Sequence, residues 1–143
     1  MAVIGFSFIK FNCERKGNAK GSIEIKHNIS IVNVEKTPLN MGSNTSEVLK
    51  IEFTFDVDYG ESIGKISLLG DVIYTDTKEI IEETYKYFLS DKKLTQIVNE
   101  QVYKFLYSKA LIKALDLSDS LNLPSPIPLP KVNFTSNKEN KIN

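Results

Sequence analysis

Residue types that catalyse reactions or bind metals are scarce in this chain. It contains one histidine, His27, and one cysteine, Cys13. These counts exclude an internal disulfide, a cysteine-rich zinc site and a multi-histidine metal site. A Ser-His-Asp triad or a Cys–His pair would have to use His27 as its base. Because His27 falls between Ile25 and Ile29 on the apolar face of an expected strand, we interpret it as a structural or edge histidine.

Two other patterns could carry chemistry. Glu52, Asp56 and Asp58 alternate along one face of an expected strand, and such a row could bind a cation or act as an acid/base pair. We interpret it as the solvated face of a half-buried strand. The segment 60–64, Gly-Glu-Ser-Ile-Gly, resembles part of a phosphate-binding loop but sits at an expected hairpin turn. We therefore predict no enzyme, no metal and no cofactor.

The net charge and the lengths of the apolar runs limit which kinds of partner the protein can bind. The 143 residues suffice for one domain with its own core, and 18 basic residues balance 18 acidic ones. A basic loop holds Arg15, Lys16 and Lys20, but nucleic-acid binding domains normally carry an overall basic excess, so we expect no nucleic acid. The chain lacks an apolar run of about 18–20 residues and a signal-peptide pattern at its start. We expect no membrane insertion and a cytoplasmic location.

The elements that would position any site are four strands followed by two helices. Period-two alternation and β-forming residues predict strands at Ile4–Phe11, Ser22–Val34, Leu49–Tyr59 and Ile63–Tyr74. We expect a loop at Pro38–Ser46 and a hairpin turn at Tyr59–Ser62.

From Asp76 onward the apolar spacing becomes helical. Asp76 with Glu79 three residues later predicts a helix N-cap, Ser90–Lys93 interrupts, and Leu94–Leu117 resumes as a long helix. Four prolines in 124–130 then favour polyproline II. We predict an α+β fold, a four-stranded antiparallel sheet with one long and one short helix on one face. Residues 1–134 would form the domain and 135–143 a disordered polar tail.

Aromatic residues are the unusual signal, with eight Phe and six Tyr but no Trp. Strict alternation predicts Phe6 and Phe8 on one face of the first strand, with Ile9 and Phe11 on the other. Gly64 and Gly70 fall on the apolar face of the fourth strand and suggest bulges or close packing. A small sheet with helices on one face cannot bury every aromatic side chain, so we expect self-association. The aromatics form either the core or a groove that receives extended polypeptide.

One segment carries a family resemblance. Residues 127–134 read Ile-Pro-Leu-Pro-Lys-Val-Asn-Phe after the long helix, and Phe8-Ile9-Lys10-Phe11 lies in the first strand. With the order of elements, these segments resemble the SecB family of export chaperones, which closes with Leu-x-Leu-x-Pro-Val-Asn-Phe. Lys131 here separates the proline from the valine. The Asn-, Lys- and Ile-rich composition suggests an archaeal homologue.

The resemblance implies an ATP-independent holdase, a homodimer or homotetramer that binds unfolded polypeptides in apolar, aromatic-lined grooves. The positions that match such a groove by residue type are Phe6, Phe8, Phe11, Phe53, Phe55 and Tyr59. The neutral charge and the absence of the family's helix sequence argue against carrying over an export partner.

Two alternatives stay open. One is a non-catalytic interaction module dedicated to one partner, for example a chaperone associated with a toxin–antitoxin system. The other is an enzyme or small-ligand protein, which would show one enclosed pocket with convergent polar groups.

Overall fold

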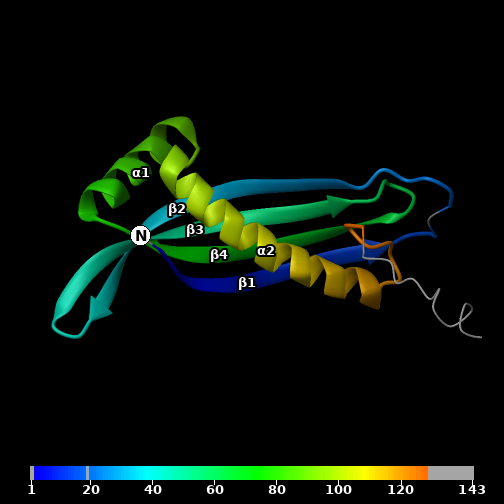
Figure 1. Ribbon diagram of the computed structural model, residues 1–143, viewed down its shortest axis with the longest axis horizontal. Helices are drawn as coiled ribbons and strands as arrows, with labels where there is room; N and C mark the ends of the chain where they lie inside the picture. Colours follow the sequence, from blue (N-terminus) through cyan, green and yellow to red (C-terminus); the bar gives the residue numbers. More distant parts are fainter. Residues whose placement is uncertain (1, 19, 129–143) are drawn as a thin grey trace, which may run out of the picture.

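The computed structural model describes residues 2–18 and 20–128. Four antiparallel strands precede two helices (Figure 1), which confirms the predicted α+β class. The strands are β1 (Ala2–Arg15), β2 (Lys26–Met41), β3 (Asn44–Asp58) and β4 (Gly64–Thr75), and the helices are α1 (Lys78–Asp91) and α2 (Gln96–Ser120). Most of the segment that resembles the SecB family, and the expected tail at 135–143, lie outside the described residues. The domain boundary at residue 134 therefore stays a prediction.

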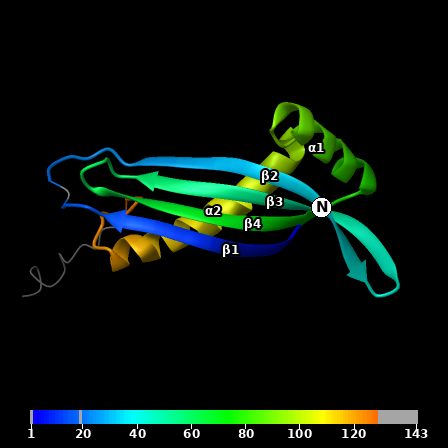
Figure 2. The same cartoon turned by 180° about the vertical axis from the view of Figure 1, so that it is seen from behind.

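The strand order is β1-β4-β3-β2, so β1 and β2 are the edge strands. α2 crosses one side of the sheet diagonally, while the opposite view shows the strands in front of it (Figures 1 and 2). α1 packs near the β2–β3 end, and α2 packs on β4 and β1. The two helices therefore cover the sheet unevenly, and each edge strand keeps one free backbone edge within the described part of the chain.

The core is formed by the helix-side faces of the two central strands. Side chains alternate between buried and less buried positions from Leu49 onward on β3 and along the whole of β4, as the period-two pattern predicted. The buried members are Leu49, Ile51, Phe53, Phe55 and Val57 on β3 and Ile66, Leu68, Val72 and Tyr74 on β4. The hairpin turn between these strands lies where it was expected, with Gly60 and Gly64 at positive φ.

Helix α2 buries a line of residues spaced by four. The buried positions are Val98, Val102, Leu106, Ala110, Ala114 and Ser118. In a helix of 3.6 residues per turn each such step turns by about 40°, so the line winds about 200° around the helix. Ile112 lies about 200° around the helix from Ala110 and Ala114, on nearly the opposite side, and is 66% exposed. The small residues from Ala110 onward allow the C-terminal half of α2 to lie close to the sheet.

The predicted faces of β1 were wrong in one respect. The pairing of β1 with β4 shifts register between Phe8 and Lys10, which makes Ile9 a bulge residue. Because the bulge adds one residue, Phe11 returns to the same face as Phe8, and their ring centroids lie 5.3 Å apart. Ile9 is left 53% exposed. Strict alternation could not anticipate this change.

The predicted loop at Pro38–Ser46 was also wrong. β2 continues through Pro38, which pairs with Glu47, and the chain turns only at Gly42, whose φ is 67°. β2 is an edge strand, so a proline there need not remove a ladder hydrogen bond. At its other end β2 begins at Lys26, later than the predicted Ser22.

The first helix begins one residue later than predicted. Thr77 is the N-cap, and its side chain accepts a hydrogen bond from the backbone N–H of Ile80. Asp76 does not cap the helix. Its carboxylate instead accepts hydrogen bonds from the Tyr74 hydroxyl at 2.7 Å and from the Thr77 N–H at 2.8 Å. The predicted interruption is confirmed, since α1 ends before Lys92, which adopts φ 59°.

Candidate functional site

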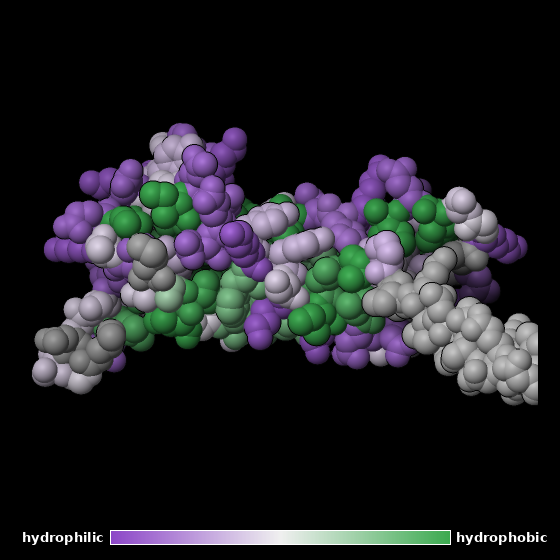
Figure 3. Space-filling view, in the orientation of Figure 1, coloured by the Kyte–Doolittle hydropathy of each residue, from purple (hydrophilic) through white to green (hydrophobic). Residues whose placement is uncertain are grey.

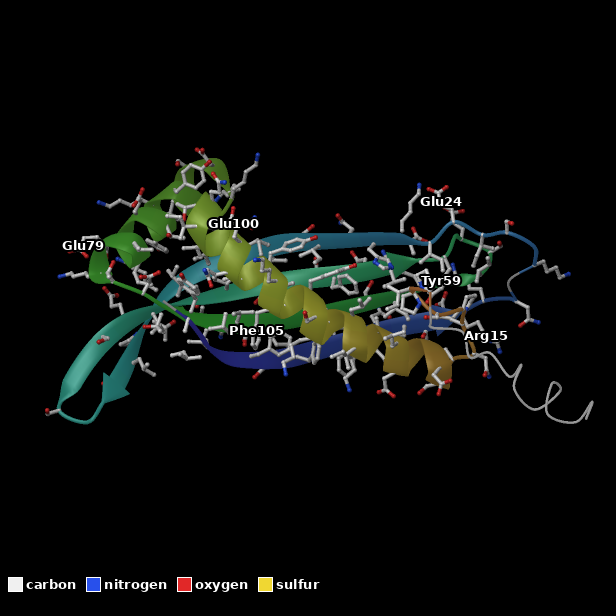
Figure 4. All side chains as sticks on the ribbon, in the orientation of Figure 1. Arg15, Glu24, Tyr59, Glu79, Glu100 and Phe105 are labelled. Atoms are coloured by element: carbon white, nitrogen blue, oxygen red, sulfur yellow. The ribbon has the colours of Figure 1, made fainter. Side chains whose placement is uncertain are left out.

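Helix α2 and the edge strand β1 together present a row of phenylalanine rings. We call the set Phe6, Phe8, Phe11 and Phe105 the β1–α2 surface. Phe6 lies 4.9 Å from Phe8 and 5.7 Å from Phe105, measured between ring centroids. Phe11 extends the row and is 44% exposed. Apolar residues gather along this side of α2 in the space-filling view (Figure 3), and Phe105 points toward β1 (Figure 4).

A glycine lets this row pack onto the core. Gly70 of β4 pairs with Phe8 on one side and Phe53 on the other. A Cβ atom at Gly70 would lie 2.6 Å from the Ser7 carbonyl oxygen and 3.0 Å from the Phe53 ring. The vacant space allows the Phe53 ring to approach β1, where it meets Phe6 at 5.6 Å. The close packing expected from Gly70 is therefore confirmed.

The six aromatic residues singled out from the sequence fall into two groups. Phe6, Phe8 and Phe11 are partly or largely exposed and share the β1–α2 surface. Phe53 lies beneath them and is fully buried. Phe55 and Tyr59 are buried near the β2 edge, away from β1.

Tyr59 forms a hydrogen bond with the segment that follows α2. Its hydroxyl donates to the Pro124 carbonyl at 2.6 Å, and burial raises the pKa of Tyr59 to about 12. A Schellman-type ending precedes this contact: Asn122 adopts φ 55°, and the Leu123 N–H donates to the Ser118 carbonyl at 2.8 Å. The segment after the helix is thereby turned back onto the end of the sheet.

His27 holds the same segment from β2. Its Nε2 lies 2.8 Å from the Pro126 carbonyl oxygen and its Nδ1 lies 3.3 Å from the Tyr107 hydroxyl. A carbonyl only accepts, so Nε2 must carry the hydrogen. In the neutral ring, Nδ1 then accepts from Tyr107. Both nitrogens serve in structural contacts, as the structural interpretation of His27 expected.

Cys13 and His27 do not form a catalytic pair. They occupy one row across the sheet, in which Cys13 pairs with Ile66, Ile66 with Val57, and Val57 with His27. Three strand spacings separate them by about 14 Å. Burial also raises the pKa of the Cys13 thiol, which disfavours the thiolate that nucleophilic chemistry needs.

The carboxylate row lies on the face of the sheet away from the helices. Glu52 and Asp56 are half-buried, and Asp58 is exposed and accepts from the Gly60 N–H at 2.8 Å in the hairpin turn. No group of three or more His, Cys, Asp or Glu in the described ranges is arranged to hold a metal. Asp58 thus has a turn-forming role.

A second aromatic surface lies on the other side of α2. We call the set Ile29, Ile31, Tyr103 and Tyr107 the β2–α2 surface. The Tyr103 and Tyr107 rings stack 5.9 Å apart, and Tyr107 meets the Phe55 ring at 5.9 Å. Phe105, Tyr103 and Tyr107 were not among the site residues expected from the sequence. Their spacing by two and four residues around one helix was the signal that could have placed them on opposite sides of it.

Comparisons with known proteins give little further information. No family model matches the chain, and no curated protein matches it. Among solved structures, the fold is similar to that of the Mycobacterium tuberculosis SecB-like chaperone Rv1957, in complex with a ChAD peptide from the Rv1956 HigA1 antitoxin. The TM-score is 0.46 at 13% identity, over 92% of this chain and 90% of that one. Membership of the SecB family stays a prediction.

The two helices differ from membrane spans in character. Within the described ranges, neither helix combines the length and hydropathy that crossing a bilayer requires.

Proposed function

We propose that this protein is an ATP-independent chaperone that holds unfolded polypeptide on the β1–α2 surface. The observation that carries the proposal is the continuous row of Phe6, Phe8, Phe11 and Phe105, left partly open beside an edge strand. An unfolded client exposes apolar side chains and unpaired backbone groups. The rings offer apolar area without sequence-specific hydrogen bonds, and the free edge of β1 offers backbone partners.

The size of the surface limits the affinity of one chain. Each exposed ring that a client covers contributes about 1–3 kcal/mol, and ordering the client opposes this gain. We therefore propose that the protein works as a homodimer or homotetramer, in which several surfaces hold one client at once. The exposed Ile97 and Ile112 on the outer side of α2 suit a contact between copies.

The buried aromatics have a supporting role in this proposal. Phe53 forms the floor beneath Phe6, while Phe55 and Tyr59 fix α2 and the segment after it. Direct contact of a client with these three residues stays a prediction.

The test is an aggregation assay with a reduced, unfolded client at stoichiometric ratio, followed by light scattering and by the mass of the complex. Wild-type protein should delay aggregation and take up the client into one larger species. Phe11→Ser should lose several-fold of that capacity and stay folded, because Phe11 is 44% exposed. Leu89→Ser is the matched control, since Leu89 is 53% exposed on α1, far from β1.

The outcomes separate the proposals. A wild-type protein that leaves aggregation unchanged would refute the holdase. A protein that forms a saturable complex with one partner and ignores unrelated clients would instead support the dedicated interaction module.

A further inference from the structure

We infer that the β1–α2 surface selects polypeptide segments in which Asp or Glu lies next to aromatic or aliphatic residues. The inference rests on the proposed holdase function and specifies its client class. Its basis is a pair of lysines, Lys109 and Lys113, that border the phenylalanine row on the α2 side. Lys109 Nζ lies 5.7 Å from the Phe105 ring centroid, and Lys113 Nζ lies 5.6 Å from that of Phe11.

The two ammonium groups lie against the rings at the two ends of the phenylalanine row. Phe105 meets Phe6, and Lys113, two turns further along α2, meets Phe11 of the same strand. α2 and β1 therefore run in the same direction here, and each lysine lies against one ring of the row. An extended segment lying along β1 would place apolar side chains on the rings and alternate or neighbouring side chains within reach of the ammonium groups.

The lysines are largely free to bind an incoming carboxylate. No carboxylate lies within ion-pair distance of Lys109 in the described part of the chain. Lys113 meets only Asp116, at 3.6 Å, one turn away on the same helix, and that carboxylate is 67% exposed. Such an exposed pair is weak and is readily exchanged. The ring faces beneath already orient both cations, which lowers the ordering cost of a new ion pair.

Lys36 on the other edge strand, β2, is a contrasting case of a lysine against an aromatic ring. Lys36 lies beside α1, with its Nζ 4.9 Å from the Tyr85 ring centroid. It is already paired with Glu82 at 2.8 Å. The hydrogen bond to Glu82 raises the pKa of Lys36, and the same bond lowers the pKa of Glu82. Unlike Lys109, Lys36 is thus already paired with a carboxylate of its own chain.

A polypeptide fits the β1–α2 surface better than a nucleic acid does. Single-strand binding proteins combine stacking rings with a positively charged groove that follows many phosphates. Here two lysines border the row, and Arg15, at the end of the same strand, bonds Asn18 Oδ1 at 2.9 Å. The chain as a whole has no net charge. Two isolated cations beside apolar rings match a peptide that carries an occasional carboxylate.

The test measures binding of three labelled peptides by fluorescence anisotropy at low salt. All three share the same Phe and Leu positions, and their intervening residues are Glu, Gln or Lys. We expect the Glu peptide to bind about fivefold more tightly than the Gln peptide, and the Lys peptide more weakly, with the differences shrinking as salt is added. The double variant Lys109→Gln/Lys113→Gln should bind the Glu and Gln peptides equally.

Lys26→Gln/Lys65→Gln is the matched control, because it removes two positive charges from the far face of the sheet. It should keep the wild-type preference. Equal binding of the Glu and Gln peptides by the wild type would overturn the inference and leave the holdase intact. Absence of binding to all three peptides would overturn both. Displacement of the Glu peptide by a single-stranded oligouridine at similar concentration would overturn it in favour of a nucleic-acid site.

Discussion

Phe8 and Phe11 lie on the same face of β1, with their rings 5.3 Å apart, although three positions separate them in the chain. The cause is the bulge at Ile9, which places two successive side chains on the opposite face. If β1 alternated regularly through Ile9, with no bulge, Phe11 would point away from α2. The continuity of the aromatic row therefore depends on one irregularity in the sheet.

Two single-residue deletions test this dependence. Deleting Ile9 removes the bulge and leaves Phe8 and Phe11 on one face with regular alternation, so the protein should stay folded with a small change in melting temperature. Deleting Ser7 shortens β1 equally but moves Phe6 to the opposite face. We expect that variant to lose several kcal/mol of stability or to fail to fold. Comparable melting temperatures for the two deletions, measured by circular dichroism, would contradict the assigned register.

Gly70→Ala should destabilise the protein by about 1–3 kcal/mol. The added Cβ would lie 2.6 Å from the backbone oxygen of Ser7 and 3.0 Å from the Phe53 ring, so β1 or the ring must move. Gly5→Ala is the matched control, because its Cβ would meet only the Ile73 side chain, at 3.1 Å. Urea denaturation should rank Gly70→Ala well below Gly5→Ala. The reverse order would argue against tight packing of Phe53 at this glycine.

Stability should fall between about pH 10 and pH 12 as Tyr59 ionises. Burial raises its pKa from the ordinary value of 10 to about 12, so the native state prefers the protonated phenol. The stabilisation is fully present below pH 10 and is lost as the pH rises toward 12, by at most about 2 kcal/mol. In Tyr59→Phe the free energy of unfolding should decrease less over this pH range, as measured by denaturation at each pH. The decrease that remains in this variant is expected from Tyr74, whose pKa is also raised by burial.

At neutral pH the same substitution has a separate cost. Tyr59→Phe leaves the Pro124 carbonyl without its 2.6 Å hydrogen bond, which should cost about 1–2 kcal/mol. A variant as stable as the wild type at pH 7 would show that the contact contributes nothing to folding.

His27→Ala should release the segment after α2 without unfolding the sheet. The substitution removes the 2.8 Å contact to the Pro126 carbonyl and the contact to Tyr107. Amide exchange at Ser125 and Ile127 should accelerate, whereas exchange in β3 and β4 should stay slow. Lys10→Ala, on the far face of the opposite edge strand, is the control and should leave the exchange of this segment unchanged. Equal protection of the segment in His27→Ala and wild type would show that Tyr59 and Leu123 hold it alone.

Much of the architecture followed from local patterns. The alternation over the residues of β3 and β4 predicted these two strands correctly, because a strand with one covered face must bury every second residue. The change of period after Asp76 predicted two helices, and the turn at Gly60 and the close packing at Gly70 were also anticipated. The single His27 and the single Cys13 excluded several kinds of site by residue count alone.

Tertiary structure decided which aromatic side chains are accessible. Phe11 and Phe53 are both phenylalanines on strands, yet Phe11 is 44% exposed and Phe53 is fully buried. The difference arises from strand order, since β3 is central and β1 is an edge, and pairing between distant strands is not encoded in local periodicity. The bulge at Ile9 and the diagonal path of α2 likewise result from packing, and they bring Lys109 and Lys113 beside the row. Local periodicity was therefore enough to predict the order of the elements and the apolar faces of β3 and β4. The faces of β1, and the rings and charges that a partner can reach, depend on how distant segments pack.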